Sequence, residues 1–131
     1  MNIIEDYVSF EVAKLLKEKG FHEPCIATYN STTKNFQVEE IYEDWTIHWK
    51  GYISVPTQQM AMKWLREEYE IDIIPIIRHN FKYAQESPFR DYACRVYDCD
   101  GNIVLSATKW YSRYENAVEA ALKYSLEKII K

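Results

Sequence analysis

The fold class is decided by residues 92–130, which read YACRVYDCDGNIVLSATKWYSRYENAVEAALKYSLEKII. Asp100-Gly101 is a strong signal for a two-residue turn between antiparallel strands. With these two residues as the loop, Val96 faces Leu105 and Cys94 faces Ala107. One face of the hairpin is then expected to meet the core: Cys94, Val96, Ile103, Leu105 and Ala107. The opposite face is expected to be partly wet: Arg95, Tyr97, Val104, Ser106 and Thr108.

A helix is expected directly after this hairpin. Ser112 and Glu115 have the spacing of a capping box, in which each side chain satisfies a backbone N–H at the start of the helix. The helix is expected to run to about Ile130, with an apolar stripe along Ala117, Val118, Ala121, Leu122, Ser125 and Ile129. A hairpin beside such a helix is typical of an α+β architecture.

Two more helices are expected upstream of the hairpin. Ser9 can cap a helix from Phe10 to Lys19, and Gly20 suits the left-handed residue that ends it. Pro56-Thr57 marks the start of the second helix, which is expected to end near Tyr69, because proline and threonine both favour a first helical turn.

The regions between these helices read as strands. The ranges 25–29 and 35–42 flank a polar turn and are expected to pair. Trp45, Ile47 and Trp49 alternate with polar residues, which is the period of a half-buried strand. A third strand is therefore expected at residues 45–49.

Residues 71–77 are expected to form a further strand. Their nearly continuous apolar character favours a central position in a sheet, whereas Pro75 favours an edge, and both positions stay open. The resulting order is helix, three strands, helix, three strands, helix. We therefore expect one α+β domain over residues 1–131, with three helices packed on an antiparallel or mixed sheet.

The three helical segments carry a resemblance to a known group of proteins. These segments are FEVAKLLKEKGF (residues 10–21), PTQQMAMKWLRE (residues 56–67) and YENAVEAALKYSLE (residues 114–127). Together they resemble small uncharacterised proteins encoded by gut bacteria and their phages. The resemblance implies an intracellular protein carried by a phage or another mobile element, and it implies no catalytic or binding residue.

Charge and cysteine usage narrow the classes of function. The net charge is −4, whereas proteins that hold nucleic acid through its phosphates are usually basic. Three cysteines give no disulfide framework, which favours a reducing cytoplasm. No segment is apolar enough to cross a bilayer, and the first residues do not resemble a secretory signal. We expect a cytoplasmic protein with no membrane partner.

A zinc site is one metal site that the residue types suggest. His22, Cys25, Cys94 and Cys99 could supply four ligands, but structural zinc sites usually contain tight Cys-x-x-Cys pairs. In the hairpin register above, Cys94 and Cys99 lie on opposite faces of one strand. We therefore expect neither a metal nor any other cofactor.

Aromatic residues are unusually abundant, at 15% of the chain, with eleven Tyr and four Trp. Because Trp and Tyr dominate the energetics of interfaces, we expect a small non-enzymatic domain that binds a protein partner or self-associates. The favoured surface is Arg95, Tyr97, Thr108 and Trp110. Sequence motifs of enzymes, such as a nucleophile elbow or a Gly-rich phosphate loop, are absent, so catalysis is the least favoured class.

A nucleic-acid-binding module is the alternative. The most basic stretch of the chain contains Arg78, His79, Lys82 and Arg90, and aromatic residues are interleaved with them. Such a pattern can hold a single strand by backbone charge and base stacking.

Overall fold

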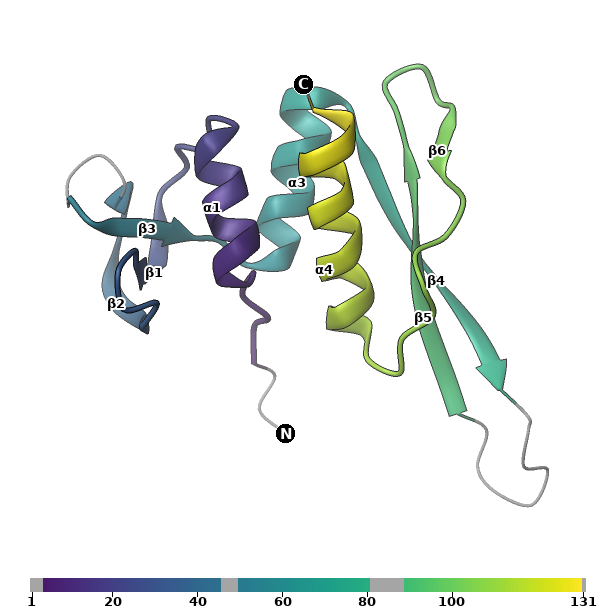
Figure 1. Ribbon diagram of the computed structural model, residues 1–131, viewed down its shortest axis with the longest axis horizontal. Coiled ribbons are helices and arrows are strands. Elements are labelled where there is room, and N and C mark those ends of the chain that lie inside the picture. Colours follow the sequence, from purple (N-terminus) through teal and green to yellow (C-terminus); the bar gives the residue numbers. More distant parts are fainter. Residues whose placement is uncertain (1–3, 46–49, 81–88, 131) are drawn as a thin grey trace.

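A computed structural model describes residues 4–45, 50–80 and 89–130 and places three helices between two antiparallel sheets (Figure 1). The first sheet has the order β2-β1-β3, built from β1 (Cys25–Asn30), β2 (Phe36–Glu43) and β3 (Tyr52–Val55). The second has the order β4-β5-β6, built from β4 (Asp72–Asn80), β5 (Phe89–Tyr97) and β6 (Ile103–Leu105). The helices are α1 (Phe10–Glu18), α3 (Gln58–Tyr69) and α4 (Tyr114–Tyr124), which a π-helical turn, η1 (Ser125–Ile129), extends. The predicted α+β class and element order are confirmed.

Two of the predicted N-terminal helix caps are confirmed. The Ser9 hydroxyl accepts a hydrogen bond from the Val12 N–H at 3.2 Å, and the Thr57 hydroxyl accepts one from the Met60 N–H at 3.1 Å. Each bond satisfies a backbone donor that has no partner inside its helix. Gly20 has a φ of 96°, as the end of α1 requires.

The predicted capping box of the third helix is wrong. The N-cap of α4 is Arg113, which makes no side-chain capping bond, so Glu115 is the second helical residue rather than the third. Its carboxylate therefore lacks the position, three residues after the N-cap, from which a capping box is made. It forms an ion pair with the Arg113 guanidinium instead, at 2.9 Å.

The third predicted strand is also wrong at the one described residue on which it rests. Trp45 has helical rather than extended backbone, and Ile47 and Trp49 lie outside the described residues. The Trp45 backbone N–H donates to the Ser54 hydroxyl at 2.8 Å, and its indole N–H donates to the Cys25 carbonyl at 2.7 Å. Both bonds hold Trp45 over the first sheet, and β3 forms only after Gly51.

Strand β4 lies at the edge of its sheet, so of the two positions left open for the strand that contains Pro75, the edge position is the one found. Pro75 lies opposite Cys94 of β5. The backbone N–H and C=O of Cys94 both bond to Thr108 on the other side of β5, at 3.0 and 2.9 Å. Pro75 therefore sits at a position that needs no donor to β5, and its missing N–H removes no bond from the sheet.

The hairpin keeps only part of its predicted register. Val96 faces Leu105 as predicted, but an irregularity follows and pairs Tyr97 with Ile103. Ile103 is therefore exposed rather than buried. The turn is also longer than two residues, since the Asp98 N–H donates to the Asn102 carbonyl. Beyond β6, Thr108 rather than Ala107 bonds to Cys94, so the prediction for this pair is wrong by one residue.

The core fills both sides of the helix layer. Its members include Leu16, Val55, Leu65, Val96 and Leu122, all fully buried. On α4, the Glu119 carboxylate accepts hydrogen bonds from the Ser9 N–H at 2.7 Å and from the Gln58 amide at 3.1 Å. This carboxylate therefore ties the first turns of α1 and α3 to α4. No helix among the described residues is long and apolar enough to cross a membrane.

Candidate functional site

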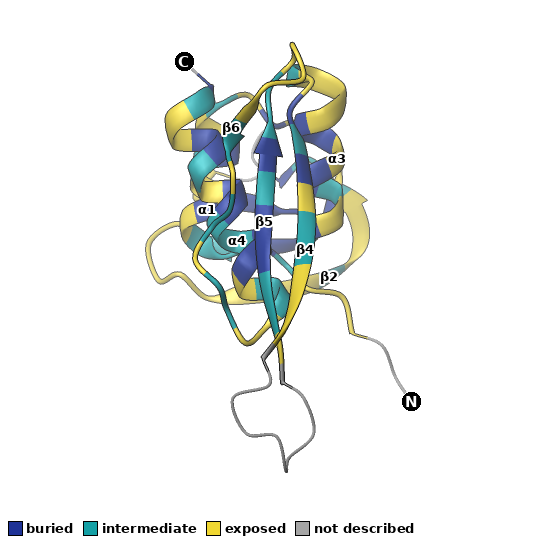
Figure 2. Ribbon diagram, turned by 90° about the vertical axis from the view of Figure 1, so that its right-hand side faces the viewer, coloured by how far each residue is buried: buried dark blue, intermediate teal, exposed yellow. Residues whose placement is uncertain are grey.

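One face of the second sheet is covered by none of the helices that the structure describes. Figure 2 shows β4, β5 and β6 in front of the helices, with this face toward the viewer. Strand alternation directs Ile73, Cys94 and Val96 toward the helices, and it directs their neighbours outward. We call the outward set the Arg–aromatic face: Ile74, Ile76, Arg78, Arg95, Tyr97 and Trp110. The four apolar and aromatic members of this set lie outside the core cluster.

One end of the Arg–aromatic face is a stack of an arginine on a tryptophan. The Arg78 guanidinium carbon lies 4.5 Å from the centre of the Trp110 ring, which suits a cation–π contact. Asp91, directly across from Arg78 on β5, accepts from the guanidinium at 3.4 Å. Two hydrogen bonds between Tyr92 and Tyr111, each 2.7 Å long, hold the segment that carries Trp110 against β5. The stack is therefore fixed from two strands.

The other end combines an unpaired charge with apolar surface. Arg95 lies directly across from Ile74, which is 46% exposed, and Tyr97 lies across from Asp72. The Arg95 Nε donates to the Ser106 carbonyl at 3.0 Å, which fixes the side chain without neutralising it. Among the described residues, Arg95 forms no ion pair. This end of the face can therefore offer a positive charge beside an exposed aliphatic side chain.

The structure brings together three of the four residues predicted as an interaction surface. Arg95, Tyr97 and Trp110 share the Arg–aromatic face. Thr108 has a structural role instead, because its hydroxyl accepts from the Cys94 N–H and donates to the Lys109 carbonyl. The sequence register had placed Thr108 beside Arg95 and Tyr97, and the irregular pairing after β6 removes it from that row.

The residues predicted to contact nucleic acid are divided. Arg78 belongs to the Arg–aromatic face, where Asp91 pairs with it. His79 and Arg90 are cross-strand neighbours one position further along, so their side chains alternate to the opposite side of the sheet. The Arg90 guanidinium carbon lies 5.9 Å from the centre of the Tyr92 ring. Lys82 lies outside the described residues.

The cysteines are separated and mostly buried. Cys25 belongs to the first sheet and Cys94 to the second, and only Cys99 is exposed. Burial raises the pKa of the Cys25 thiol to about 12, with Asp44 and Glu23 adding to the effect, and burial raises that of Cys94 to about 11. Within the described part of the chain, no three residues of metal-ligating type are grouped as a metal site requires.

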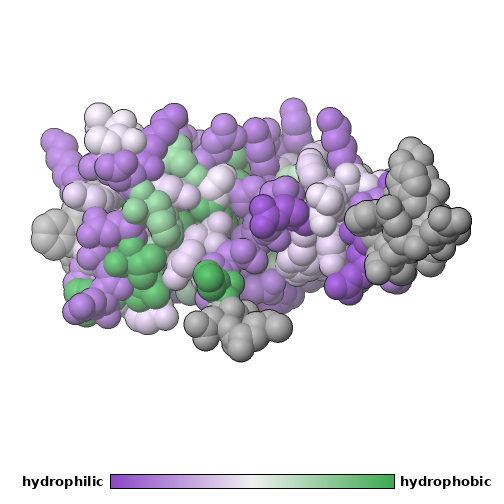
Figure 3. All heavy atoms as spheres, turned by 90° about the horizontal axis from the view of Figure 1, so that it is seen from below, coloured by the Kyte–Doolittle hydropathy of each residue, from purple (hydrophilic) through white to green (hydrophobic). Residues whose placement is uncertain are grey.

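Strand β2 separates an apolar side from a polar side. Phe36 and Val38 lie on one side, both more than 40% exposed, and Phe36 contacts the rings of Tyr7 and Tyr29. Figure 3 shows apolar side chains gathered on the half of the molecule that holds the first sheet. Gln37 and Glu39 alternate to the other side of β2. That polar side faces away from the helices.

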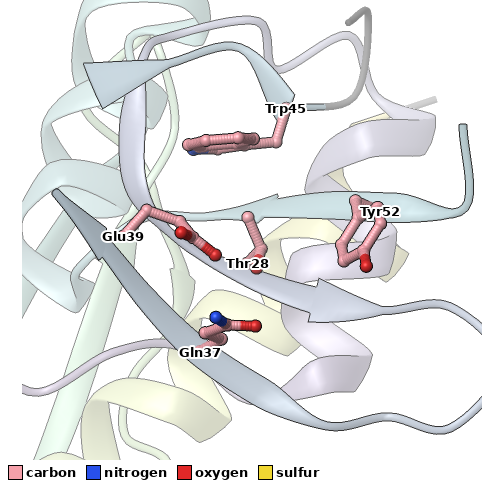
Figure 4. Close-up of a pocket in the computed structure, with 5 residues that line it drawn as sticks. All are labelled: Thr28, Gln37, Glu39, Trp45 and Tyr52. Carbon is pink, nitrogen blue, oxygen red and sulfur yellow. The ribbon is translucent and has the colours of Figure 1, made fainter. Parts of the chain in front are cut away.

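A pocket lies on this polar side, and the sequence analysis did not predict it. Its volume is about 300 Å³, and its lining residues are Thr28, Gln37, Glu39, Trp45 and Tyr52 (Figure 4). These residues come from β1, β2 and β3, together with Trp45, whose helical backbone follows β2. The alternation of Gln37 and Glu39 with apolar neighbours was visible in the sequence. The folding back of Trp45 was not, because it depends on bonds to residues 20 and 9 positions away.

Comparisons with known proteins found no match to a family model, a curated protein or a solved structure.

Proposed function

We propose that this protein is a non-enzymatic module that binds another protein through the Arg–aromatic face. The observation that carries the proposal is the composition of that uncovered face: an exposed isoleucine, a tyrosine and two arginines on β4 and β5, beside a tryptophan from the segment that follows β6. Trp, Tyr and Arg are the residues most enriched among the energetic hot spots of protein interfaces. A protein partner can bury the apolar members, which water otherwise surrounds.

The charge of the face favours a protein partner over nucleic acid. Arg78 and Arg95 are balanced by Asp72 and Asp91, which belong to the same side of the sheet. A surface without net positive charge releases few counterions from a phosphate backbone and gains little affinity from it. Arg95, which keeps its charge, suits a single carboxylate on the partner. The partner's complementary surface therefore has a carboxylate bordered by apolar side chains.

A selection from a random peptide library tests this proposal. Peptides displayed on phage are selected on the wild-type protein and counter-selected on an Arg95→Gln/Trp110→Ser variant. We expect the retained peptides to carry Asp or Glu next to aromatic or aliphatic residues. Titration calorimetry should then show affinity about tenfold or more lower for Arg95→Gln, as for the loss of a charge-assisted bond.

Arg66→Gln is the matched control, because it removes the same charge from an exposed position on α3, away from the face. It should leave peptide affinity unchanged. Peptides that bind both proteins equally would contradict the proposal. A salt-dependent complex with single-stranded oligonucleotides, weakened by Arg78→Gln and Arg90→Gln, would favour the nucleic-acid alternative instead.

A further inference from the structure

The pocket on the first sheet has a polar floor built from one row of residues across three strands. Thr28 of β1 lies between Gln37 of β2 and Ser54 of β3, in register with both. Alternation turns all three side chains away from α1, toward the side where the pocket lies. Glu39 and Tyr52 follow two positions along β2 and β3, so they extend the same polar surface.

The Thr28 hydroxyl is an unusual feature of this floor. The residue is only 1% exposed, yet its Oγ1 has no hydrogen-bond partner among the described residues. A buried hydroxyl without a partner costs stability, and native structures leave few of them. Figure 4 shows this hydroxyl between the side chains of Glu39 and Tyr52, below the ring of Trp45. The unused bonding capacity therefore lies at the bottom of the pocket.

The roof of the pocket is preorganised. Trp45 is 8% exposed, and hydrogen bonds to Cys25 and Ser54 fix both its backbone and its indole ring. Because the indole N–H is already used, the ring can offer only its π-system to a ligand. Tyr52 supplies a second ring to the lining of the pocket. The faces of aromatic rings attract cations.

Among the described residues that line the pocket, one carries a negative charge and none carries a positive charge. Glu39 is its charged member, and among the described residues it forms no ion pair. Glu40 and Glu43 belong to the same strand and add to the negative potential. Anionic ligands are therefore disfavoured, whereas a cation gains from the carboxylate and from both rings.

We propose that this pocket binds an organic cation, an alkylammonium or guanidinium group, held between the Trp45 and Tyr52 rings and the Glu39 carboxylate with the Thr28 hydroxyl as a floor acceptor. A volume of about 300 Å³ suits one such head group and its short alkyl stem. The group can belong to a free amine or to a lysine or arginine side chain of a protein. This site is on the opposite sheet from the Arg–aromatic face and does not depend on the proposal made for that face.

An NMR titration tests the proposal on the full chain. The Trp45 indole N–H resonance, assigned with a Trp45→Phe variant, is followed while probes are added. Choline represents a free amine, and Nα-acetyl-lysine methylamide represents a side chain. Nα-acetyl-norleucine methylamide is the neutral comparison. We expect saturable shifts from at least one charged probe, with a dissociation constant of about 1–10 mM, and none from the neutral one.

Glu39→Gln and Glu40→Gln make a matched pair, since they remove the same charge from neighbouring residues that alternate to opposite sides of β2. Glu39→Gln should weaken binding about tenfold, and Glu40→Gln should weaken it less than threefold. Thermal unfolding of both variants checks that they fold. Equal shifts from the neutral probe, equal losses in the two variants, or no shift from either cation would each overturn the proposal.

Discussion

Replacing Thr28 with valine should stabilise the protein. Thr28 is buried, and its hydroxyl has no partner among the described residues, so Thr28→Val removes an unsatisfied polar atom without breaking a bond. Removing an unpaired buried hydroxyl relieves a cost of about 1–3 kcal/mol, and a methyl group in its place adds about 0.8 kcal/mol of apolar burial. Both residues are β-branched and suit a strand. After allowance for imperfect packing, the expected gain in the free energy of unfolding is about 1–2 kcal/mol.

Urea and thermal unfolding, followed by circular dichroism, measure this gain. At about 3–5 °C per kcal/mol for a chain of this length, the midpoint should rise by about 3–10 °C. Thr57→Val provides the control, because it makes the same substitution where the hydroxyl caps α3 by accepting from Met60. It should lower the free energy of unfolding by about 1–2 kcal/mol. If Thr28→Val destabilised the protein as much as Thr57→Val, the hydroxyl would be satisfied, and the argument from a vacant acceptor would fail.

Three further predictions concern stability and thiol chemistry. Glu119→Ala should lower the free energy of unfolding, measured by urea titration, by about 2–4 kcal/mol, because two hydrogen bonds to a carboxylate are lost. The control Glu11→Gln changes an exposed carboxylate and should alter the free energy of unfolding by less than about 0.5 kcal/mol. At pH 8 a thiol reagent should modify Cys99 rapidly, and it should modify Cys25 and Cys94 only after the protein unfolds. Mass spectrometry counts the modified thiols. Rapid modification of a second thiol would contradict the burial of Cys25 and Cys94. Because the pKa values of Cys25 and Cys94 are raised in the folded protein, the thiols of the unfolded chain lose their protons at a lower pH. The two thiols should therefore leave the free energy of unfolding unchanged below pH 9 and should lower it as the pH rises above 9. A Cys25→Ala variant should show a shallower fall over the same range.

The helices were predictable because their signals are local. Ser9 and Thr57 cap helices through bonds to residues three positions away, and Gly20 ends one by its own conformation. Glu115 shows the limit of such signals. Its spacing from Ser112 was right for a capping box, but the helix begins one residue later than predicted. The Glu115 carboxylate forms an ion pair with an arginine instead.

The sites were less predictable because they depend on pairing between distant strands. Arg95 and Tyr97 were chosen from hairpin alternation, and Trp110 also belongs to their face. The approach of Arg78 to Trp110 could not be foreseen, since it needs the pairing of β4 with β5 and of Tyr92 with Tyr111. The pocket was missed for the same reason. Its polar floor spans three strands, and its roof is a tryptophan whose sequence pattern predicted a strand.

The central claim is that the Arg–aromatic face is the surface that binds a protein partner. The most direct measurement is an NMR titration of the isotope-labelled protein with a peptide from the selection described above. The account predicts that shifts of the backbone amides concentrate at Ile74, Arg95, Tyr97 and Trp110, and that Trp110→Ser abolishes them. Shifts that concentrate on α3 or around Gln37 and Tyr52, and that persist in Trp110→Ser, would contradict it.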